Sequence, residues 1–577
     1  MNYSCSRRFA YSLGAAIGAL LVAIPGVGPG VGAQAASALP EAYIPHPISA
    51  AQAALFRAHP DAYLRYVAQL PRRSAIDSKA AAKRTTVAGG GTWTKVAQGP
   101  GGLCSPVLLT DGTVIASVGD TPKWFKLSPD VNGNYAKGTW AAIASLPVVN
   151  GKQYGPLYHA TGVLPDGRVI IMGGEYNNSN HGVWTNSGAI YDPVANAWTP
   201  VEPPLGSQWQ NIGDAASVVL SDGTFMLSAC CAGPTADALL DAKTLGWDGI
   251  YGPVAGEGYQ DEQGYELLPN TNVLTLDVWT NYPNGGATNA EQYVQGTRHW
   301  KSAGNTPVSL VDPAQCGNWE IGPAALRGDG TVVAFGGNTG CATAPFLTDP
   351  TAVYTAASNS WAAGPNVPSV CGGDGATPCS LADAPAALEP DGNVLFAASS
   401  GYGSAPTHFF EFTPGNTISQ VSDTVLHAPT SGAYYYNFLV LPNGQILSTD
   451  FSDRAEVYSP AGAPVAAWAP AITYAPTEVT AGKTYQVKGT QLNGVSQGAY
   501  YGDDAQMATN YPIVRVTNVA SGHVVYGRTW NMSSMSVTPG KSSSASFSVP
   551  VGVETGASTL SVVANGIASA PVSVTIR

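Results

Sequence analysis

The chain has 577 residues and a formal net charge of −12, and only 11% of its residues are charged, against about 25% in an average domain. The acidic balance excludes a nucleic-acid-binding protein, which needs a basic face, and 44% hydrophobic residues with 13 Trp and 27 Tyr exclude a disordered chain. With 67 Gly and 44 Pro, the composition indicates a turn-rich β protein of two or more domains.

Residues 1–35 have the features of a signal peptide. Two arginines precede an apolar run over residues 9–24, and Ala33-Gln34-Ala35 offers a small-residue cleavage site. This pattern predicts a secreted or periplasmic protein with no membrane span, in which disulfides persist. Residues 36–91 follow as an N-terminal helical segment and linker.

Cleavage would remove Cys5 and leave an odd number of cysteines from the 8 in the chain. The candidate pairs are Cys371 with Cys379 across a glycine-rich turn, Cys316 with Cys341, and the adjacent Cys230 and Cys231, which form either a vicinal disulfide or two separate thiols. If all three pairs form, Cys104 is the residue left over.

A repeated pattern of two apolar runs around a tight turn organises residues 92–468. Asp-Gly between two β-rich runs predicts a hairpin, because Gly accepts the positive φ that such turns need. The turns lie about 48 to 62 residues apart, the spacing of kelch repeats, and they begin at Asp111, Asp166, Asp222, Asn270, Asp329, Asp391 and Asn443.

The repeats predict an all-β protein built on a seven-bladed kelch-type β-propeller. Tyr and Trp seven residues apart support this prediction, as at Tyr191 and Trp198, and the run ending at Val96 is expected to supply the outer strand of the seventh blade. Residues 469–577 lose the repeat and alternate Thr, Val and Ser, which predicts an immunoglobulin-like β-sandwich.

This combination of a signal peptide, a kelch propeller and an immunoglobulin-like domain resembles the galactose oxidase and glyoxal oxidase family of copper radical enzymes. In that family two Tyr and two His hold one copper ion, and a thioether joins one Tyr to a Cys of the first blade. The resemblance implies oxidation of primary alcohols or aldehydes of sugars. It places the cross-linked pair at Cys104 and Tyr158, the stacking aromatic at Tyr176 and the axial Tyr at Tyr434, so that Tyr158 and Tyr434 would be the metal ligands.

Both histidine positions of the family are substituted here. Tyr435 stands where the family has one ligand His, and the Thr-His sequence of its C-terminal domain is matched by Thr529-Trp530. Copper(II) prefers imidazole nitrogens, which an indole cannot replace. His159 lies next to Tyr158 on a strand, so its side chain is expected to point to the opposite face. The resemblance therefore implies a degenerate copper site.

Carboxylates recur at one position of the repeat. Eight or nine residues before the turn stand Asp214, Glu262, Glu320 and Asp383 in repeats three to six. Because inner strands begin at the same end of a propeller channel, these four side chains are expected to converge. Such a ring could bind calcium through oxygen ligands, supply the carboxylate pair of a glycosidase, or accept hydrogen bonds from sugar hydroxyls. Alternatively, the acids bond to backbone N–H groups of the neighbouring blade.

Three functions follow from these residues. The favoured one is recognition of a carbohydrate or another small polyol at the propeller mouth by the four carboxylates together with Tyr158, Tyr176, Tyr434 and Tyr435. The alternatives are a copper radical oxidase and a carbohydrate-active enzyme that uses the carboxylates without copper.

Overall fold

The computed structural model describes residues 85–88, 90–178, 184–204, 209, 211–230, 236–253, 260, 262–278, 280, 287–311, 320–337, 349–368, 371, 379–401, 403–502 and 507–577. The described part is all β apart from two short 3₁₀ turns, η3 (Ala433–Tyr435) and η4 (Ala466–Trp468). No described helix has the length and apolar character needed to cross a bilayer. The expected signal peptide and all but the last residues of the expected linker lie outside the described residues.

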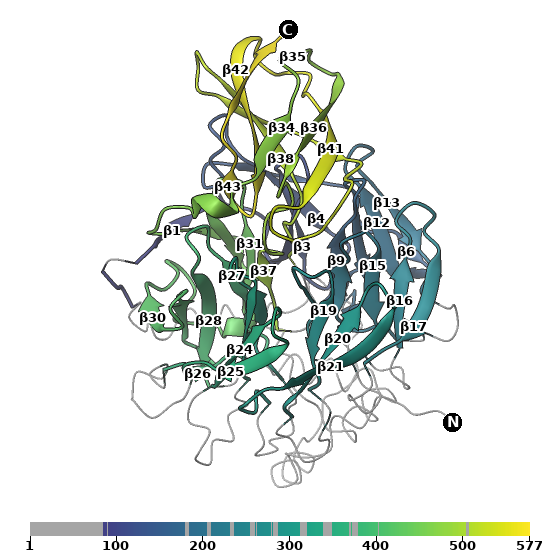
Figure 1. The fold of residues 1–577 in the computed structure, drawn as a ribbon, viewed down its shortest axis with the longest axis vertical. Helices are drawn as coiled ribbons and strands as arrows, with labels where there is room; N and C mark the ends of the chain where they lie inside the picture. Colours follow the sequence, from purple (N-terminus) through teal and green to yellow (C-terminus); the bar gives the residue numbers. More distant parts are fainter. Residues whose placement is uncertain are drawn as a thin grey trace, which may run out of the picture.

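Each of the seven sequence repeats lies in its own antiparallel sheet with four main strands, as predicted (Figure 1). The sixth sheet has two further short strands, and the seventh takes its fourth strand from before the first repeat. The first three sheets are β2 (Leu103–Leu108), β3 (Val114–Val118), β4 (Trp124–Ser128) and β5 (Thr139–Ala142); β9 (Ala160–Val163), β10 (Val169–Met172), β12 (Gly188–Asp192) and β13 (Ala197–Val201); and β14 (Ser217–Val219), β15 (Phe225–Ser228), β16 (Ala236–Leu240) and β17 (Trp247–Tyr251).

The next three sheets follow the same order along the chain. They are β18 (Glu266–Leu267), β19 (Val273–Leu276), β20 (Asn289–Val294) and β21 (His299–Asn305); β22 (Ala324–Leu326), β23 (Thr331–Phe335), β24 (Thr351–Thr355) and β25 (Ser360–Ala363); and β27 (Ala386–Leu388), β28 (Val394–Ser400), β29 (Thr407–Phe412) and β30 (Ile418–Val421).

The seventh sheet joins the two ends of the repeat region. Its strands β31 (Asn437–Val440), β32 (Ile446–Thr449) and β33 (Glu456–Ser459) are completed by β1 (Thr92–Lys95), which pairs antiparallel with β33 in the register Trp93 with Tyr458. The sequence prediction that the run ending at Val96 supplies this outer strand is confirmed.

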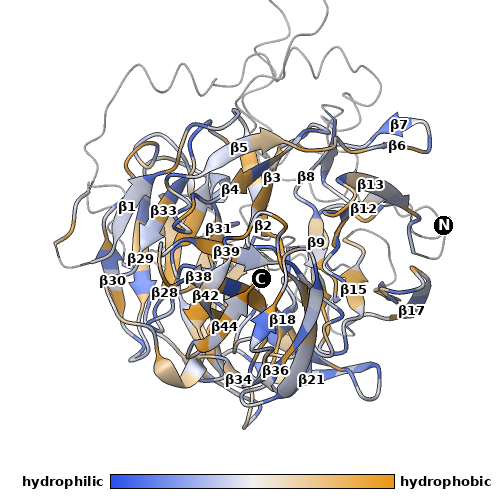
Figure 2. Ribbon diagram, turned by 90° about the horizontal axis from the view of Figure 1, so that it is seen from above, coloured by the Kyte–Doolittle hydropathy of each residue, from blue (hydrophilic) through white to orange (hydrophobic). Residues whose placement is uncertain are grey.

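The first strands of the seven sheets lie side by side in the order β9, β14, β18, β22, β27, β31 and β2. Seen from above, the labelled first strands β2, β9, β18 and β31 are nearer the middle, and the last strands β5, β13, β17, β21, β30 and β1 are toward the rim (Figure 2). The first and second sheets also meet, because the rings of Trp124 and Trp198 are 5.1 Å apart. This arrangement is consistent with a β-propeller.

Aromatic pairs hold the outer strands together. Tyr191 lies opposite Trp198, and the same cross-strand pairing joins Tyr293 to Trp300 and Tyr354 to Trp361. Their ring centroids are 5.0, 5.8 and 4.9 Å apart. The seven-residue spacing in the sequence therefore marks a hairpin whose two aromatic side chains share one face, an arrangement that stabilises paired strands.

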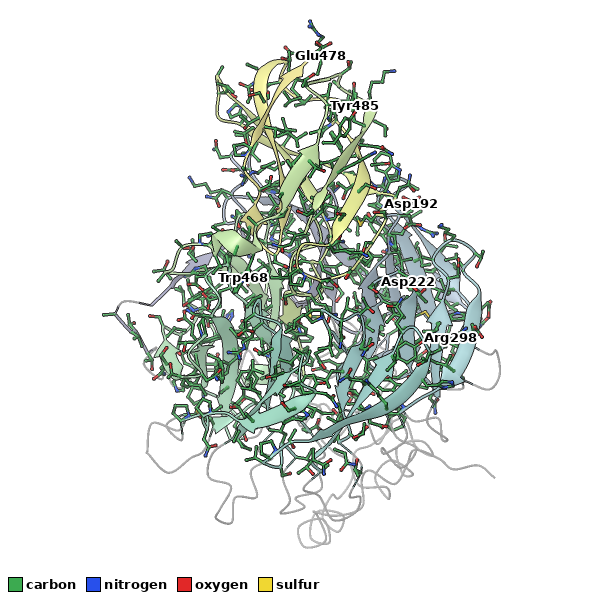
Figure 3. All side chains as sticks on the ribbon, viewed as in Figure 1. Asp192, Asp222, Arg298, Trp468, Glu478 and Tyr485 are labelled. Atoms are coloured by element: carbon green, nitrogen blue, oxygen red, sulfur yellow. A yellow bond between two sulfur atoms is a disulfide. The ribbon has the colours of Figure 1, made fainter. Side chains whose placement is uncertain are left out.

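Residues 471–576 form two further sheets above the first seven (Figure 1). One contains β34 (Ala471–Tyr474), β36 (Thr484–Thr490), β41 (Ser542–Ser548) and β40 (Thr529–Trp530); the other contains β35 (Glu478–Val479), β44 (Val572–Ile576), β42 (Gly556–Ala564), β38 (Ile513–Asn518), β39 (Val524–Gly527) and β43 (Ile567–Ala568). Trp468 lies at the boundary between the two regions in Figure 3, where its ring fits over Gly328 and leaves no room for a side chain there.

The tight turns of the repeats face these C-terminal strands. A Cβ at Gly112 would lie 2.5 Å from the ring of Tyr526, and one at Gly167 would lie 2.9 Å from the carbonyl oxygen of Thr529. The inner strands run toward these turns, so they begin at the opposite end of the sheets. That opposite end is where the sequence predicts the functional residues.

Short strands decorate the sheets. They are β6 (Val148–Val149) with β7 (Lys152–Gln153), β8 (Pro156–Leu157) with β11 (Tyr176–Asn177), β26 (Cys379–Ser380) on β28, and β37 (Ala499–Tyr500) on β27. The last of these matters most for the site, because β37 belongs to the C-terminal part of the chain and pairs with an inner strand of the sixth sheet.

Candidate ligand site at the start of the inner strands

A segment of the C-terminal region passes among the inner strands. The hydroxyl of Ser496 donates to the carbonyl of Leu326, and the side-chain oxygen of Gln497 accepts from the backbone N–H of Leu267. The chain then continues through β37 to Tyr501, whose hydroxyl donates to the carbonyl of Tyr434 at 2.8 Å. Tyr501 is thereby carried to the far end of the inner strands, away from its own sheets.

Five tyrosines and one cysteine meet there, and we call them the tyrosine cluster: Cys104, Tyr158, Tyr176, Tyr434, Tyr435 and Tyr501. Tyr158 and Tyr501 stack with centroids 6.2 Å apart, and Tyr176 meets Tyr158 edge-on at 6.3 Å. The rings of Tyr434 and Tyr435 are 4.2 Å apart. Five of the six positions were predicted from the sequence, and the structure brings them together.

Cys104 lies at the apolar side of this cluster. It is a fully buried thiol that packs with Leu157 and Tyr176, with Tyr158 and Phe451 against them. Its sulfur is 3.1 Å from the hydroxyl oxygen of Ser117. Cys104 and Tyr158 therefore share one cluster, as the family resemblance implied.

Three carboxylates converge beside the tyrosines. Glu262, Glu320 and Asp383 each offer one oxygen atom, and these atoms lie within 4.8 Å of one another. We call these residues the carboxylate triad. The chain at Tyr501 runs against it, because a Cβ at the next residue, Gly502, would lie 2.8 Å from the Cα of Asp383. Asp214 is buried but is not part of the triad, so its place in the predicted ring stays a prediction.

Three of the residues here have an unusual backbone conformation. Tyr158, Glu262 and Asp383 have φ angles of 51°, 59° and 53°, in the left-handed region that costs a non-glycine residue of order 1 kcal/mol or more. Each is the residue eight positions before its turn, so the conformation is a shared feature of the repeat. Such strain clusters at functional sites.

The Tyr158 phenol is electrically neutral in this setting. Burial raises the pKa of Tyr158 well above its usual value, and the nearby Tyr435, Glu175 and Asp383 raise it further. The hydroxyl oxygen is buried and has no hydrogen-bond partner among the described residues. An acceptor or donor supplied by a ligand would satisfy it.

The described histidines do not join the tyrosine cluster. The ring of His159 lies 6.1 Å from that of Trp124, and its Nδ1 atom is 3.1 Å from the Thr161 hydroxyl. Tyr158 and His159 lie between β8 and β9 and not on a strand, so the strand alternation assumed for them does not apply. His408, His427 and His523 each pair with a carboxylate elsewhere. Since copper(II) favours imidazole ligands, the described donor set of phenols and carboxylates does not fit the copper site that the resemblance implies. His181 lies outside the described residues.

The match of Thr529-Trp530 to a ligand-bearing position is wrong. Thr529 donates its hydroxyl proton to Pro512, and its backbone N–H bonds to the carbonyl of Thr110, at the turn end of the first sheet. Trp530 lies beneath the guanidinium of Arg528 at 5.1 Å. The residue of the C-terminal region that reaches the cluster is Tyr501, which sequence reasoning missed. The aromatic pair Tyr500-Tyr501 before Gly502 was the available signal.

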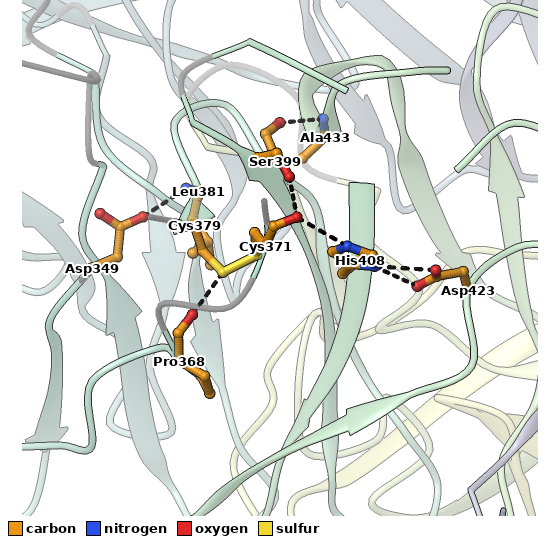
Figure 4. Close-up of a disulfide and its surroundings, with 10 residues drawn as sticks. Asp349, Pro368, Cys371, Cys379, Leu381, Ser399, His408, Asp423 and Ala433 are labelled. Atoms are coloured by element: carbon orange, nitrogen blue, oxygen red, sulfur yellow. Dashed lines mark hydrogen bonds and ion pairs between the residues drawn. A yellow bond between two sulfur atoms is a disulfide. The ribbon is translucent and has the colours of Figure 1, made fainter. Parts of the chain in front are cut away.

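The predicted disulfide between Cys371 and Cys379 is present, with Cα atoms 5.0 Å apart (Figure 4). Cys230 is also disulfide-bonded. Cys231, Cys316 and Cys341 lie outside the described residues.

No family model and no curated protein matches the chain. Among solved structures, it is similar to a fungal alcohol oxidase of the AA5 family in complex with copper, with a TM-score of 0.46 and 14% identity over 84% of this chain and 99% of that chain. It is also similar to the extracellular domain of a hybrid two-component system from B. thetaiotaomicron, with a TM-score of 0.41 and 10% identity over 86% of this chain and 60% of that one. Both likenesses are too distant to assign an activity.

Proposed function

We propose that this protein is a secreted, galactose-oxidase-like binding protein that recognises a carbohydrate or another small polyol through the carboxylate triad and the tyrosine cluster. The observation that carries the proposal is the convergence of Glu262, Glu320 and Asp383 within 4.8 Å, beside stacked tyrosines. A signal peptide over 1–35 and a linker over 36–91 complete the proposed organisation.

The proposed frame is a closed seven-bladed propeller over 92–468, followed by an immunoglobulin-like domain over 469–577. Two observations support closure. The first strands of neighbouring sheets lie side by side from β9 round to β2, and Trp124 packs on Trp198 between the first and second sheets. The pairing of β1 with β33 would then close the ring, because it joins the beginning of the repeat region to its last sheet.

The chemistry of the triad suits a polyol. Three ionised carboxylates this close repel one another unless a cation, a shared proton or hydrogen-bond donors compensate their charge. Adjacent hydroxyl groups of a sugar are such donors, and hydrogen bonds to a carboxylate are about twice as strong as neutral ones. A calcium ion held by the same oxygens would serve as well, since it takes carboxylate and hydroxyl ligands together.

The tyrosines supply the remaining part of the proposed site. Aromatic rings bind the apolar face of a sugar ring, and their hydroxyls bond to its polar edge. Tyr158 has a buried hydroxyl without a partner among the described residues, next to Asp383. A ligand hydroxyl beside Asp383 would give the Tyr158 hydroxyl a partner.

A second candidate is a glycosidase that uses the triad. The triad oxygens lie within 4.8 Å of one another, nearer than the roughly 6.5–9.5 Å between the carboxyls of inverting enzymes and close to the roughly 5 Å of retaining ones. A copper radical oxidase is favoured only by the contact region shared by Cys104 and Tyr158, and the described donor set does not fit copper.

Binding to a panel of neutral oligosaccharides tests the proposal, followed by calorimetry with the best binder. Glu262→Gln and Asp383→Asn should each weaken binding at least tenfold without changing the unfolding midpoint, because an amide loses the charge but keeps the shape. Glu202→Gln, an exposed residue outside the site, is the matched control. Unchanged affinity in both triad variants would overturn the proposal, and hydrolysis of the bound sugar would select the glycosidase.

A further inference from the structure

His408 lies on β29 and connects two parts of the sixth sheet (Figure 4). Its Nδ1 atom is 3.1 Å from both carboxylate oxygens of Asp423, and its Nε2 atom is 3.1 Å from the carbonyl oxygen of Cys371. A carboxylate and a carbonyl can only accept hydrogen bonds, whereas a neutral imidazole carries one N–H. The geometry therefore fits the doubly protonated, cationic ring.

Asp423, on one side of His408, binds the first described residues of the chain. The Asp423 carboxylate accepts from the backbone N–H of Thr85 at 2.9 Å, and the Asp423 N–H donates back to the Thr85 carbonyl. The neighbouring Ser422 hydroxyl accepts from the N–H of Val87. Residues 85–87 are thus attached to the sixth sheet through the partner of His408.

The disulfide lies on the other side of His408. Cys371 is bonded to Cys379, whose strand β26 pairs with Ser399 and Ser400 of β28. Ser400 also donates its hydroxyl proton to the Cys371 carbonyl, and the Ser399 hydroxyl accepts from the N–H of Ala433, the residue before Tyr434. Two hydrogen bonds, through the adjacent residues Ser400 and Ser399, therefore connect the Cys371 carbonyl to Ala433, which precedes Tyr434 of the tyrosine cluster.

Few groups near His408 can titrate. Asp423 is the ionisable residue that faces the ring among the described residues; Cys371 and Cys379 form a disulfide, and the residue opposite His408 on β28 is Ala398. Burial lowers the pKa of His408, but the Asp423 bond and charge and the Cys371 carbonyl outweigh it, so the pKa lies above its usual value. Stability from the charged form is complete below about pH 6.5 and is lost as pH rises through the raised pKa.

We propose that His408 is a proton-dependent clasp that, in its cationic form, joins residues 85–87 through Asp423 to the disulfide at Cys371. Loss of the proton leaves the remaining N–H on the carboxylate, which is the stronger acceptor, and releases the Cys371 carbonyl. The clasp does not depend on the identity of the ligand, so its failure and the failure of the proposed function are separable.

Nitrogen NMR of the histidine-labelled full chain tests the protonation state, with His408→Gln identifying the signal. Both ring nitrogens of His408 should be protonated at pH 6, and one should lose its proton at a pH above 6.5. Amide exchange, corrected for the intrinsic pH dependence, should become at least fivefold faster around Cys371 between pH 6 and pH 9. A neutral ring at pH 6 would overturn the proposal.

Two variants keep the exchange experiment decisive. His408→Gln and Asp423→Asn should both show fast corrected exchange around Cys371 already at pH 6, with no further change at pH 9. His523→Gln, which removes an exposed histidine paired with Glu554, should behave like the parent. Equal corrected exchange of the parent at both pH values would also contradict the clasp, even if one variant failed to fold.

Discussion

The ring of Tyr501 stacks on the ring of Tyr158 with centroids 6.2 Å apart and planes at 20°. The two residues are far apart in the chain, since Tyr158 precedes an inner strand of the second sheet and Tyr501 follows β37 in the C-terminal region. The hydroxyl of Tyr501 also bonds to the carbonyl of Tyr434. One side chain thus links the start of the second and seventh inner strands to the C-terminal region.

Two substitutions of Tyr501 should separate the effect of its ring on ligand affinity from the effect of its hydroxyl. Tyr501→Ala removes one aromatic ring of the proposed site; if its contact with the ligand is worth about 1.4 kcal/mol, the upper part of the range for aromatic contacts, binding should be about tenfold weaker. Tyr501→Phe keeps the ring and removes the hydroxyl that bonds to Tyr434, so its affinity should fall less than threefold. Calorimetry with the best oligosaccharide measures both.

The matched control is Tyr474→Ala, because Tyr474 is exposed on a C-terminal strand away from the cluster. Equal affinities of Tyr501→Ala and the parent would remove Tyr501 from the proposed site.

The repeat region could be predicted from the sequence because its signals are local. The turn beginning at each of the seven Asp or Asn residues forms between neighbouring strands, and even the fourth turn, which lacks Gly, keeps the conformation, with Thr271 at a φ of 71°. Tyr191 and Trp198 face each other for the same reason. Counting eight or nine residues back from each turn therefore also identified the carboxylate triad, because residues at this position of the repeat all lie where the inner strands begin, at one end of the sheets.

The contribution of Tyr501 could not be found in this way. Its position depends on a segment that leaves one group of sheets and pairs with β27 of another, and such long-range pairing leaves no period in the sequence. The family pattern matches Thr529-Trp530, but β40, which consists of these two residues, lies at the turn end of the sheets. The position of a residue in the repeat predicts its place along an inner strand, but it does not predict which segment of the C-terminal region lies among the inner strands.

Removing the disulfide should destabilise the protein measurably. Cys371 and Cys379 are separated by 8 residues, and closing a loop of that length is worth about 2.5 kcal/mol in the chain-entropy model. The double variant Cys371→Ser/Cys379→Ser should therefore unfold at lower denaturant concentration with an unchanged slope. Reduction of the parent would also break the disulfide of Cys230, so the comparison is between the oxidised parent and the oxidised variant, and equal midpoints for these two would contradict the prediction.

His159 should make the protein less stable in acid. Burial lowers its pKa to about 4, from an ordinary value of 6.5, despite the opposing bond to the Ala160 carbonyl. The unfolded chain thus takes up the proton first as pH falls, and the free energy of unfolding decreases between pH 6.5 and 4, by up to about 3 kcal/mol. The contribution of His408 to stability changes with pH in the opposite direction, because its pKa is raised and its charged form stabilises the folded state at low pH.

Urea unfolding at pH 7 and pH 4.5 measures this effect. His159→Gln should lose less stability over that interval than the parent, whatever its stability at pH 7, while His523→Gln should match the parent. A variant with the same pH dependence as the parent would show that His159 does not carry the acid sensitivity.

Cys104 should remain a thiol when the protein meets copper. Cross-linking to Tyr158 would need a metal that accepts electrons beside the phenol, and the described residues near it offer phenols and carboxylates rather than imidazoles. Burial also keeps the pKa of Tyr158 high, so the phenol would not readily ionise to bind a metal. After incubation with copper(II) in air and dialysis, the protein should retain no copper, and peptides with Cys104 and Tyr158 should have their unmodified masses.

Tyr158→Phe treated in the same way is the control. A parent-specific loss of two hydrogens in a linked Cys104–Tyr158 peptide, together with bound copper, would contradict this prediction. The missing imidazole would then have to come from outside the described residues, with His181 the first to replace, because it follows Tyr176 closely in the chain. Loss of copper in His181→Ala would identify it as the ligand, and the carboxylate triad would then flank an oxidase site instead of forming the binding site itself.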